Sequence, residues 1–150
     1  MTDYKKIFLD TAPFIYFLDN DTNYAPKVKS IFAEILRKNI PMATSVITCE
    51  EYLVFPFRTN NLEKIAVFYE FIRDCHISLY NINQNTAEKA AQIRAEYPHF
   101  KGMDSLQLAA ACTAGCDIFL TNDKQLRHFH EITCITINDW ENDERCENNL

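Results

Sequence analysis

The stretch Phe100–Asp123, "FKGMDSLQLAAACTAGCDIFLTND", decides how the rest of the chain is interpreted. Its first half has high helix propensity and stops at Gly115, a residue type that commonly follows a helix. The apolar run "CDIFLT" then predicts a buried strand. Carboxylates stand at both ends of this apolar unit, Asp104 where the helix opens and Asp123 just after the strand. We therefore ask whether these acids are structural or belong to one site.

The alternation of helix and strand continues toward both ends of the chain. Short apolar or alternating runs predict strands at residues 5–10, 40–46, 76–82, 116–121 and 132–137. Helical spacing of apolar residues predicts helices at 11–19, 25–39, 47–57, 61–75, 85–97 and 103–114. The third helix is expected to stop at Pro56, and residues 123–129 to form a short helix or turn. The pattern predicts one α/β domain spanning residues 1–150, with a parallel sheet covered on both faces and a polar, frayed tail from about residue 138.

Composition limits the functions that are open to the chain. With two glycines in 150 residues, neither GxGxxG nor GxxxxGK[ST] can be written, which excludes glycine-rich phosphate loops. The net charge of -6 argues against a broad nucleic-acid coat, but it allows a local basic groove. The six cysteines include no C-x-x-C pair, so we expect reduced, mostly buried thiols and no zinc site. Without a signal peptide or a membrane-length apolar run, we expect a cytoplasmic protein with no membrane association.

Several acidic residues are predicted to meet at one edge of the sheet. Ligands of open parallel sheets bind outside the carboxyl ends of the strands. Asp10 and Asp123 each follow a predicted strand at that edge, and Glu50 and Glu51 come a few residues after another. The place of Asp104 depends on the geometry of its loop. Gathered carboxylates repel one another unless a cation neutralises them, and a hard divalent ion that does so can activate water for phosphodiester hydrolysis.

Each acid also has an ordinary structural explanation. Asp10 and Asp104 could cap the helices that follow them, and Asp123 could be a turn residue. Glu51 could form a capping box with Thr48, in the pattern T-x-x-E. Singly, none of the acids is a strong signal of function. Their joint placement at one sheet edge favours a site.

Four segments resemble the PIN domain in the small form found in VapC-type toxins, namely "IFLDTAPFIYFL", "TSVITCEEYL", "GMDSLQLAAACTAGCDIFLTND" and "ITCITI". The resemblance implies a three-layer α/β/α sandwich with a central parallel sheet. It also implies an endoribonuclease that depends on Mg²⁺ or Mn²⁺, acts on RNA and is paired with a small antitoxin. The family's acidic residues fall on Asp10, Glu51, Asp104 and Asp123, which we expect to be both catalytic residues and metal ligands. Glu50 remains the alternative to Glu51.

Three other functions remain open. A phosphatase with a nucleophilic aspartate at a strand end would show D-x-D, whereas Asp10 begins "DTA". A PIN domain that binds RNA or protein without catalysis would lack one or more of the four acids. A receiver-type signalling domain would need a lysine after a strand, and none is suitably placed.

Basic and aromatic side chains are the candidates for contacts with partners. The basic residues that could contact RNA phosphates are Arg127, His128, His130, Lys5, Lys6, Arg58, Lys101 and Lys124. Among the abundant aromatics, those in the helices after the second strand could form an apolar patch for a homodimer or an antitoxin helix. These aromatics are Phe55, Phe57, Tyr69 and Phe71.

Overall fold

A five-stranded sheet forms the centre of the computed structural model, which describes residues 4–140. All its strand pairs are parallel, in the order β3-β2-β1-β4-β5. The strands are β1 (Ile7–Leu9), β2 (Met42–Ser45), β3 (Ser78–Tyr80), β4 (Ile118–Thr121) and β5 (Thr133–Thr136). The expected α/β fold with a central parallel sheet is confirmed.

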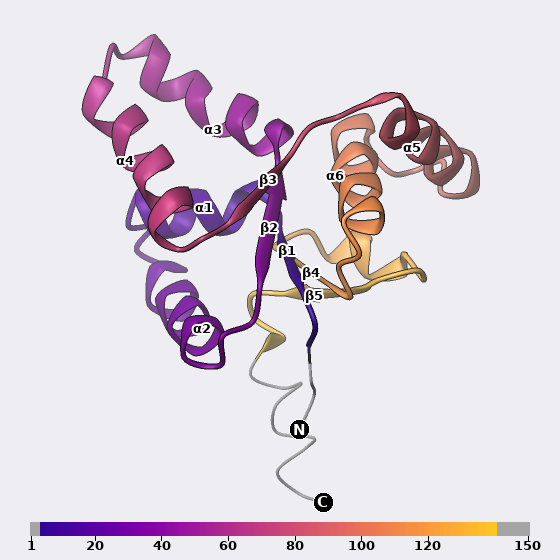
Figure 1. The fold of residues 1–150 in the computed structure, drawn as a ribbon, viewed down its shortest axis with the longest axis horizontal. Helices are drawn as coiled ribbons and strands as arrows, with labels where there is room; N and C mark the ends of the chain where they lie inside the picture. The colour runs from indigo at the N-terminus through magenta and orange to yellow at the C-terminus, as the bar shows by residue number, and fades with distance from the viewer. Residues whose placement is uncertain (1–3, 141–150) are drawn as a thin grey trace, which may run out of the picture.

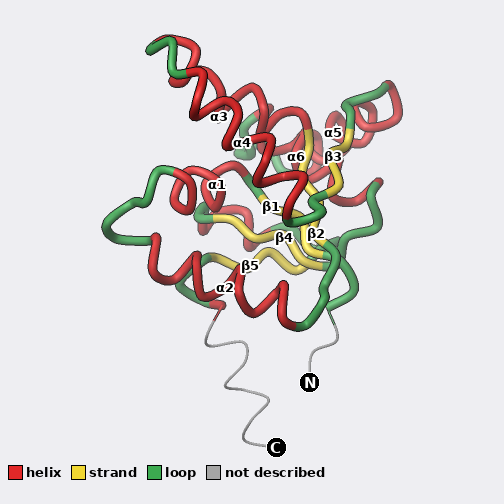
Figure 2. The backbone as a smooth tube through the Cα atoms, turned by 60° about the vertical axis from the view of Figure 1, so that its left-hand side comes forward, coloured by secondary structure: helices red, strands yellow, loops and turns green. Residues whose placement is uncertain are grey.

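Helices cover both faces of the sheet and complete three layers (Figure 1). The helices are α1 (Thr11–Leu18), α2 (Ala25–Arg37), α3 (Val46–Arg58), α4 (Leu62–Asp74), α5 (Gln84–Glu96) and α6 (Gly102–Thr113), with a short 3-10 helix η1 (Lys124–His128). Helices α1 to α4 lie on one side of the sheet, and α5 and α6 lie side by side on the other (Figure 1, Figure 2).

Each central strand contributes to two hydrophobic cores, because successive side chains of a strand point to opposite faces. Ile7 and Leu9 of β1 pack with the side chains of α1 to α4, while Phe8 packs with those of α5 and α6. Strand β4 divides in the same way, and its Phe119 stacks on Phe8 with ring centroids 5.4 Å apart. Burial on both faces explains why these strands are continuous apolar runs in the sequence.

Strand β1 is the point at which the strand order reverses. The chain adds β2 and β3 on one side of β1 and then crosses over to place β4 and β5 on the other. Ligands of such sheets bind at the carboxyl ends of the strands beside this switch point. Because Leu9 of β1 is aligned with Leu120 of β4, the residues that follow these two strands meet there.

Helix α3 differs from the sequence expectation, since it continues through Pro56 to Arg58. Pro56 is buried, so its packing offsets the backbone hydrogen bond that a proline cannot donate inside a helix. The helix ends at Thr59, whose hydroxyl donates to the Phe55 carbonyl oxygen at 3.0 Å. A short turn then leads into α4, where the Asn61 side chain accepts a hydrogen bond from the Lys64 backbone.

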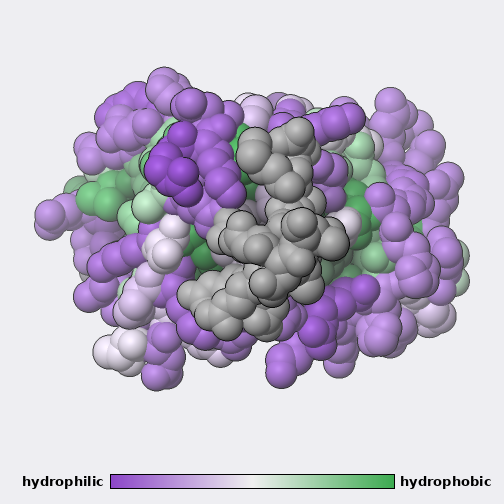
Figure 3. Space-filling view, turned by 90° about the horizontal axis from the view of Figure 1, so that it is seen from below, coloured by the Kyte–Doolittle hydropathy of each residue, from purple (hydrophilic) through white to green (hydrophobic). Residues whose placement is uncertain are grey.

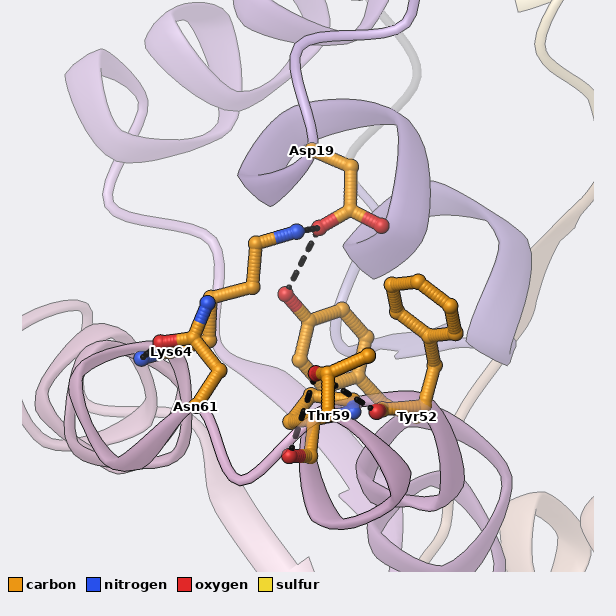
Figure 4. A network of polar contacts seen from close by, with 7 residues as sticks. Asp19, Tyr52, Thr59, Asn61 and Lys64 are labelled. Carbon is orange, nitrogen blue, oxygen red and sulfur yellow. Dashed lines mark hydrogen bonds and ion pairs between the residues drawn. The ribbon is translucent and has the colours of Figure 1, made fainter.

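The hairpin of α3 and α4 is fixed to the end of α1 by one carboxylate. Figure 4 shows the Tyr52 phenol and the Lys64 ammonium directed at Asp19. The phenol donates to Asp19 Oδ1 at 2.9 Å, and Lys64 Nζ lies 3.2 Å from the same oxygen. Since α1 begins at the carboxyl end of β1, this contact ties the hairpin to the sheet edge where the acids are expected.

The last described residue, Trp140, packs in the hydrophobic core beside α2. The indole is 3% exposed, and its N–H donates to Glu34 Oε2 of α2 at 2.9 Å. Residues 138–140 of the expected polar tail are therefore anchored by an aromatic side chain in the core. The remainder of that tail, residues 141–150, lies outside the described residues.

The described surface is predominantly hydrophilic when the molecule is viewed from below (Figure 3). Within residues 4–140, no helix is both long enough and apolar enough to cross a lipid bilayer. The cysteines in this part of the chain are free thiols, and Cys116 and Cys134 are buried.

Candidate active site

Asp10 ties the end of β1 to the end of β4. Its carboxylate accepts hydrogen bonds from the Thr11 backbone at 2.9 Å and from the Thr121 hydroxyl at 2.8 Å. Its own N–H donates to the Leu120 carbonyl oxygen at 3.0 Å. Asp10 is also the N-cap of α1, so the structural explanation and the expected position at the sheet edge both hold.

Burial raises the pKa of Asp10 from 3.8 to about 6. The hydrogen bonds from Thr121 and Thr11 oppose this shift, and the charges of Asp104 and Glu51 add to it. A carboxylate with this pKa is still mainly ionised at neutral pH, at a cost that a nearby cation would offset.

Glu51 is held by a hydroxyl group from α1. Glu51 Oε1 accepts a hydrogen bond from Thr11 Oγ1 at 2.7 Å. The alternative explanation of Glu51 as part of a capping box with Thr48 does not hold, because α3 begins earlier. Ser45 is its N-cap, and the Ser45 hydroxyl accepts a hydrogen bond from the Ile47 backbone. Glu51 is thus free to turn toward the sheet edge.

Asp104 lies in the first turn of α6 but does not cap it. The N-cap is Lys101, which makes no side-chain capping hydrogen bond. Burial is the main cause that raises the pKa of Asp104, and the charge of Asp123 is the next. Glu51 raises it further and Lys101 lowers it. The alternative explanation of Asp104 as the cap of the alanine-rich helix therefore does not hold.

Asp123 follows β4 and begins η1. Its carboxylate accepts a hydrogen bond from the Gln125 backbone at 2.9 Å, so it serves as a turn residue as well as facing the other acids. The neighbouring Asn122 donates to the Tyr16 hydroxyl of α1 at 2.8 Å, which fixes this loop against the opposite layer.

The structure brings the four predicted acids to the same sheet edge. Asp10 is coupled to Asp104 and Glu51 through charge repulsion, and Asp104 is coupled to Asp123 and Glu51. Glu51, Asp104 and Asp123 line one pocket of about 670 Å³. Of the two adjacent glutamates, Glu51 lines this pocket and Glu50 does not.

The carboxylate oxygens at this edge are the kind of ligand that a hard divalent cation prefers. Within residues 4–140, no group of three or more His, Cys, Asp or Glu side chains is arranged to hold a metal ion. Magnesium commonly uses only one or two carboxylates in proteins and keeps several waters. Coupled carboxylates with raised pKa values would gain from such a cation. The chemistry of the side chains therefore fits the expected ion.

A buried polar network lies beneath Glu51, and the sequence analysis missed it. Gln107 of α6 is 1% exposed, and its amide donates to the Thr48 hydroxyl at 2.8 Å. The Ser45 hydroxyl donates to the other end of the same amide. The Thr48 hydroxyl oxygen lies 3.4 Å from that of Thr11, and the Thr11 hydroxyl in turn donates to Glu51. The available signal was one amide in an otherwise apolar stretch of helix, "SLQLAAA".

The second wall of the pocket comes from α5 and the start of α6. It contains Arg94 and Lys101 beside an apolar surface that includes Ala87, Ala90 and Ala91. Lys101 was among the basic candidates, whereas Arg94 was missed. The other basic candidates do not line the pocket, and those are Arg127, His128, His130, Lys5, Lys6, Arg58 and Lys124.

Comparisons with known proteins agree with this architecture. The family model for the PIN domain matches residues 7–132. No curated protein matches the chain. The similar solved structures include VapBC2 from Rickettsia felis bound to a DNA fragment from its promoter, with 14% identity, coverage of 87% of this chain and 98% of that chain, and a TM-score of 0.71.

Two further solved structures share the fold. DNA-bound VapBC from Salmonella typhimurium is 22% identical over 88% of this chain and 98% of that chain, with a TM-score of 0.68. VapC20 from Mycobacterium tuberculosis, a toxin that cleaves the sarcin-ricin loop, is 14% identical over 85% of this chain and 98% of that chain, with a TM-score of 0.62. At these identities the likeness shows the fold alone. The family match, which spans most of the chain and both strands beside the switch point, shows that this chain belongs to the PIN domain family.

Proposed function

We propose that this protein is an endoribonuclease that hydrolyses RNA phosphodiester bonds with Mg²⁺ or Mn²⁺ and acts as the toxin of a toxin–antitoxin pair. The observation that carries the proposal is the charge coupling of Asp10, Glu51, Asp104 and Asp123 at the switch point of the sheet. The likeness to VapC20, a toxin that cleaves the sarcin-ricin loop, supports it.

The contribution of the chain to catalysis is the positioning of acceptor oxygens. The Thr121 hydroxyl and the Thr11 backbone orient the Asp10 carboxylate, and the Thr11 hydroxyl orients that of Glu51. Asp104 and Asp123 line the pocket together with Glu51 and complete the acidic edge. Carboxylates from this set of four, together with bound waters, would hold a divalent cation, and that cation would supply a Lewis acid that stabilises negative charge on the phosphate and lowers the pKa of water.

A small antitoxin is the proposed protein partner. The VapBC structures from Rickettsia felis and Salmonella typhimurium are similar to this chain and are complexes of toxin and antitoxin. The α3–α4 hairpin exposes Phe55, Phe57 and Leu62, which are 61%, 61% and 76% exposed. Large apolar side chains exposed on one hairpin are candidates for an interaction surface. Phe71 does not belong to this surface, because it packs in the core against Phe17 with ring centroids 4.8 Å apart.

The test of activity uses purified protein and RNA with Mn²⁺ or Mg²⁺. We expect cleavage that stops in EDTA and that is abolished by Asp104→Asn. The matched control is Glu63→Gln, which neutralises another acid in the first turn of a helix, far from the pocket lining. Undiminished cleavage in excess chelator would refute metal dependence. Binding of RNA without any cleavage would favour the PIN domain that binds without catalysis.

A further inference from the structure

The pocket beside the acids has a chemically distinct second wall. Ala87, Ala90 and Ala91 of α5 follow helical spacing and therefore share one face of that helix. Arg94 continues the same face one turn later, toward the start of α6. The pocket thus runs from three carboxylates, across a smooth apolar surface, to a guanidinium group. Its volume of about 670 Å³ is in the range of pockets that enclose small organic ligands.

Arg94 is the cation of this wall that has no partner. Within the described residues it makes no hydrogen bond or ion pair, whereas Lys101 is coupled to Asp104 and lowers the pKa of that carboxyl. The guanidinium reaches over the first residue of α6, because a Cβ on Gly102 would lie 3.8 Å from Arg94 Nη1. A planar, permanently charged group at the rim of an acidic pocket is suited to an anion that spans both.

We propose that Arg94 binds an RNA backbone phosphate next to the one that is cleaved, and that the alanine face of α5 seats the nucleotide between them. RNA therefore enters this site as an unpaired strand, because a base can occupy the pocket only after it leaves a duplex stack. The apolar face accommodates the base, and the arginine neutralises a phosphate that the acidic edge would otherwise repel. This inference rests on the proposed nuclease function.

The experiment measures kcat/KM for a fluorogenic single-stranded RNA in Mn²⁺ over a range of salt concentrations. We expect Arg94→Gln to lower kcat/KM about tenfold at low salt, which is typical for the loss of one charged hydrogen bond. We also expect the slope of log kcat/KM against log salt to become shallower by about 0.7, because one phosphate contact is lost. The matched control is Arg37→Gln, another exposed arginine in the last turn of a helix, outside the pocket.

A second pair of variants tests the nucleotide seat. Ala91→Leu should fill the pocket and raise KM, whereas Ala95→Leu, at an exposed position of the same helix outside the pocket, should leave KM unchanged. Both replacements are good helix formers, so neither should unfold α5. Annealing the substrate to its complement should suppress cleavage by the wild type.

The outcomes separate this inference from the function on which it rests. If the wild type cleaves RNA and Arg94→Gln retains its kcat/KM and salt slope, the inference is overturned and the nuclease function stands. Equal losses in Arg94→Gln and Arg37→Gln, or equal KM values for Ala91→Leu and Ala95→Leu, would also overturn it. If the wild type cleaves no RNA, both proposals fail.

Discussion

Thr11 links two of the acids through a single residue. Its backbone N–H donates to Asp10, and its hydroxyl donates to Glu51, although the residue itself is only 7% exposed. A β-branched side chain has few rotamers, which fixes the direction of the hydroxyl. Thr11 therefore positions both carboxylates, that of Asp10 after β1 through the helix cap and that of Glu51 on α3 through its hydroxyl.

Thr11→Val removes the hydroxyl while it keeps the shape of the side chain. We expect RNA cleavage to fall about tenfold, because Glu51 loses the donor that orients it, a loss of roughly 1–2 kcal/mol. Thr11→Ser should retain most activity, and Thr133→Val, at an exposed position of β5, should retain all of it. Cleavage rates and thermal melts of the three variants provide the measurement. Equal activity of Thr11→Val and the wild type would show that Glu51 needs no support from α1.

The titration of Asp10 predicts how the stability of the metal-free protein depends on pH. Its pKa rises from 3.8 to about 6 in the folded state, so the folded protein holds this proton more tightly than the unfolded chain. The free energy of unfolding should therefore fall as the pH rises through this window, by roughly 3 kcal/mol from this group. Asp104 shifts in the same direction.

Urea unfolding in EDTA between these pH values measures this effect. We expect Asp10→Asn to flatten the decline, because the variant cannot titrate at this position. Added Mn²⁺ at neutral pH should restore stability to the wild type. A decline of the same steepness in Asp10→Asn would show that other groups control the pH dependence.

The elements themselves were largely predictable from the sequence. Strands buried on both faces are continuous apolar runs, and helices packed on one face show helical spacing, so both kinds of element leave a strong local pattern. The continuation of α3 through Pro56 was not predictable, because it depends on packing within the hairpin. Asp10 and Asp123 were placed by the strand-end rule, whereas the approach of Arg94 to Gly102 depends on how α5 meets α6.

The position of Asp104 in the first turn of α6 allows a structural role for this acid to be distinguished from a role in the site. A carboxylate in the first turn of a helix is normally stabilised by the helix dipole by about 0.3–1 kcal/mol. Asp104 lies in such a turn, yet burial and the charges of Asp123 and Glu51 raise its pKa. The folded state therefore disfavours the charge of Asp104 in spite of the dipole.

Asp104→Asn should consequently leave the metal-free protein as stable as the wild type, or more stable. Glu63→Gln in the first turn of α4 should lose the dipole contribution of about 0.3–1 kcal/mol, since Glu63 is exposed and lines no acidic pocket. Mn²⁺ at a hundredfold excess over its dissociation constant should stabilise the wild type by roughly 2.7 kcal/mol. Melting curves with and without Mn²⁺ should show this gain in Glu63→Gln and a reduced gain in Asp104→Asn. Equal gains in both variants would show that Asp104 does not bind the metal.

At the scale of the whole molecule, the two helical layers have different surfaces. The α5–α6 layer carries the basic end of the pocket, and the α3–α4 hairpin projects from the other layer (Figure 1). The hairpin exposes several of its apolar side chains. This hairpin is held to α1 by the contacts of Tyr52 and Lys64 with Asp19 (Figure 4). Its exposed apolar surface therefore has a fixed position relative to α1. A partner bound there would be connected to the acidic edge of the sheet through α1, whose N-cap is Asp10.

The hairpin surface predicts where an antitoxin binds. The variant Phe55→Ser with Leu62→Ser removes two of the most exposed apolar side chains and should leave folding nearly unchanged, because substitutions at exposed positions rarely alter stability by more than about 0.5 kcal/mol. The antitoxin of the proposed pair, co-expressed with the wild type, should co-purify with it. The variant should bind it at least tenfold more weakly, as is usual when aromatic contacts at an interface are truncated.

Leu36→Ser on α2 is the matched control, because Leu36 is 46% exposed but lies on a different helix. Size-exclusion chromatography of each protein alone distinguishes the remaining occupant of this surface, a second copy of the chain. If the isolated wild type is a dimer that the hairpin variant converts to a monomer, the surface serves self-association. If the hairpin variant retains full affinity for the antitoxin, the antitoxin binds elsewhere, and the exposed aromatics of α3 need another explanation.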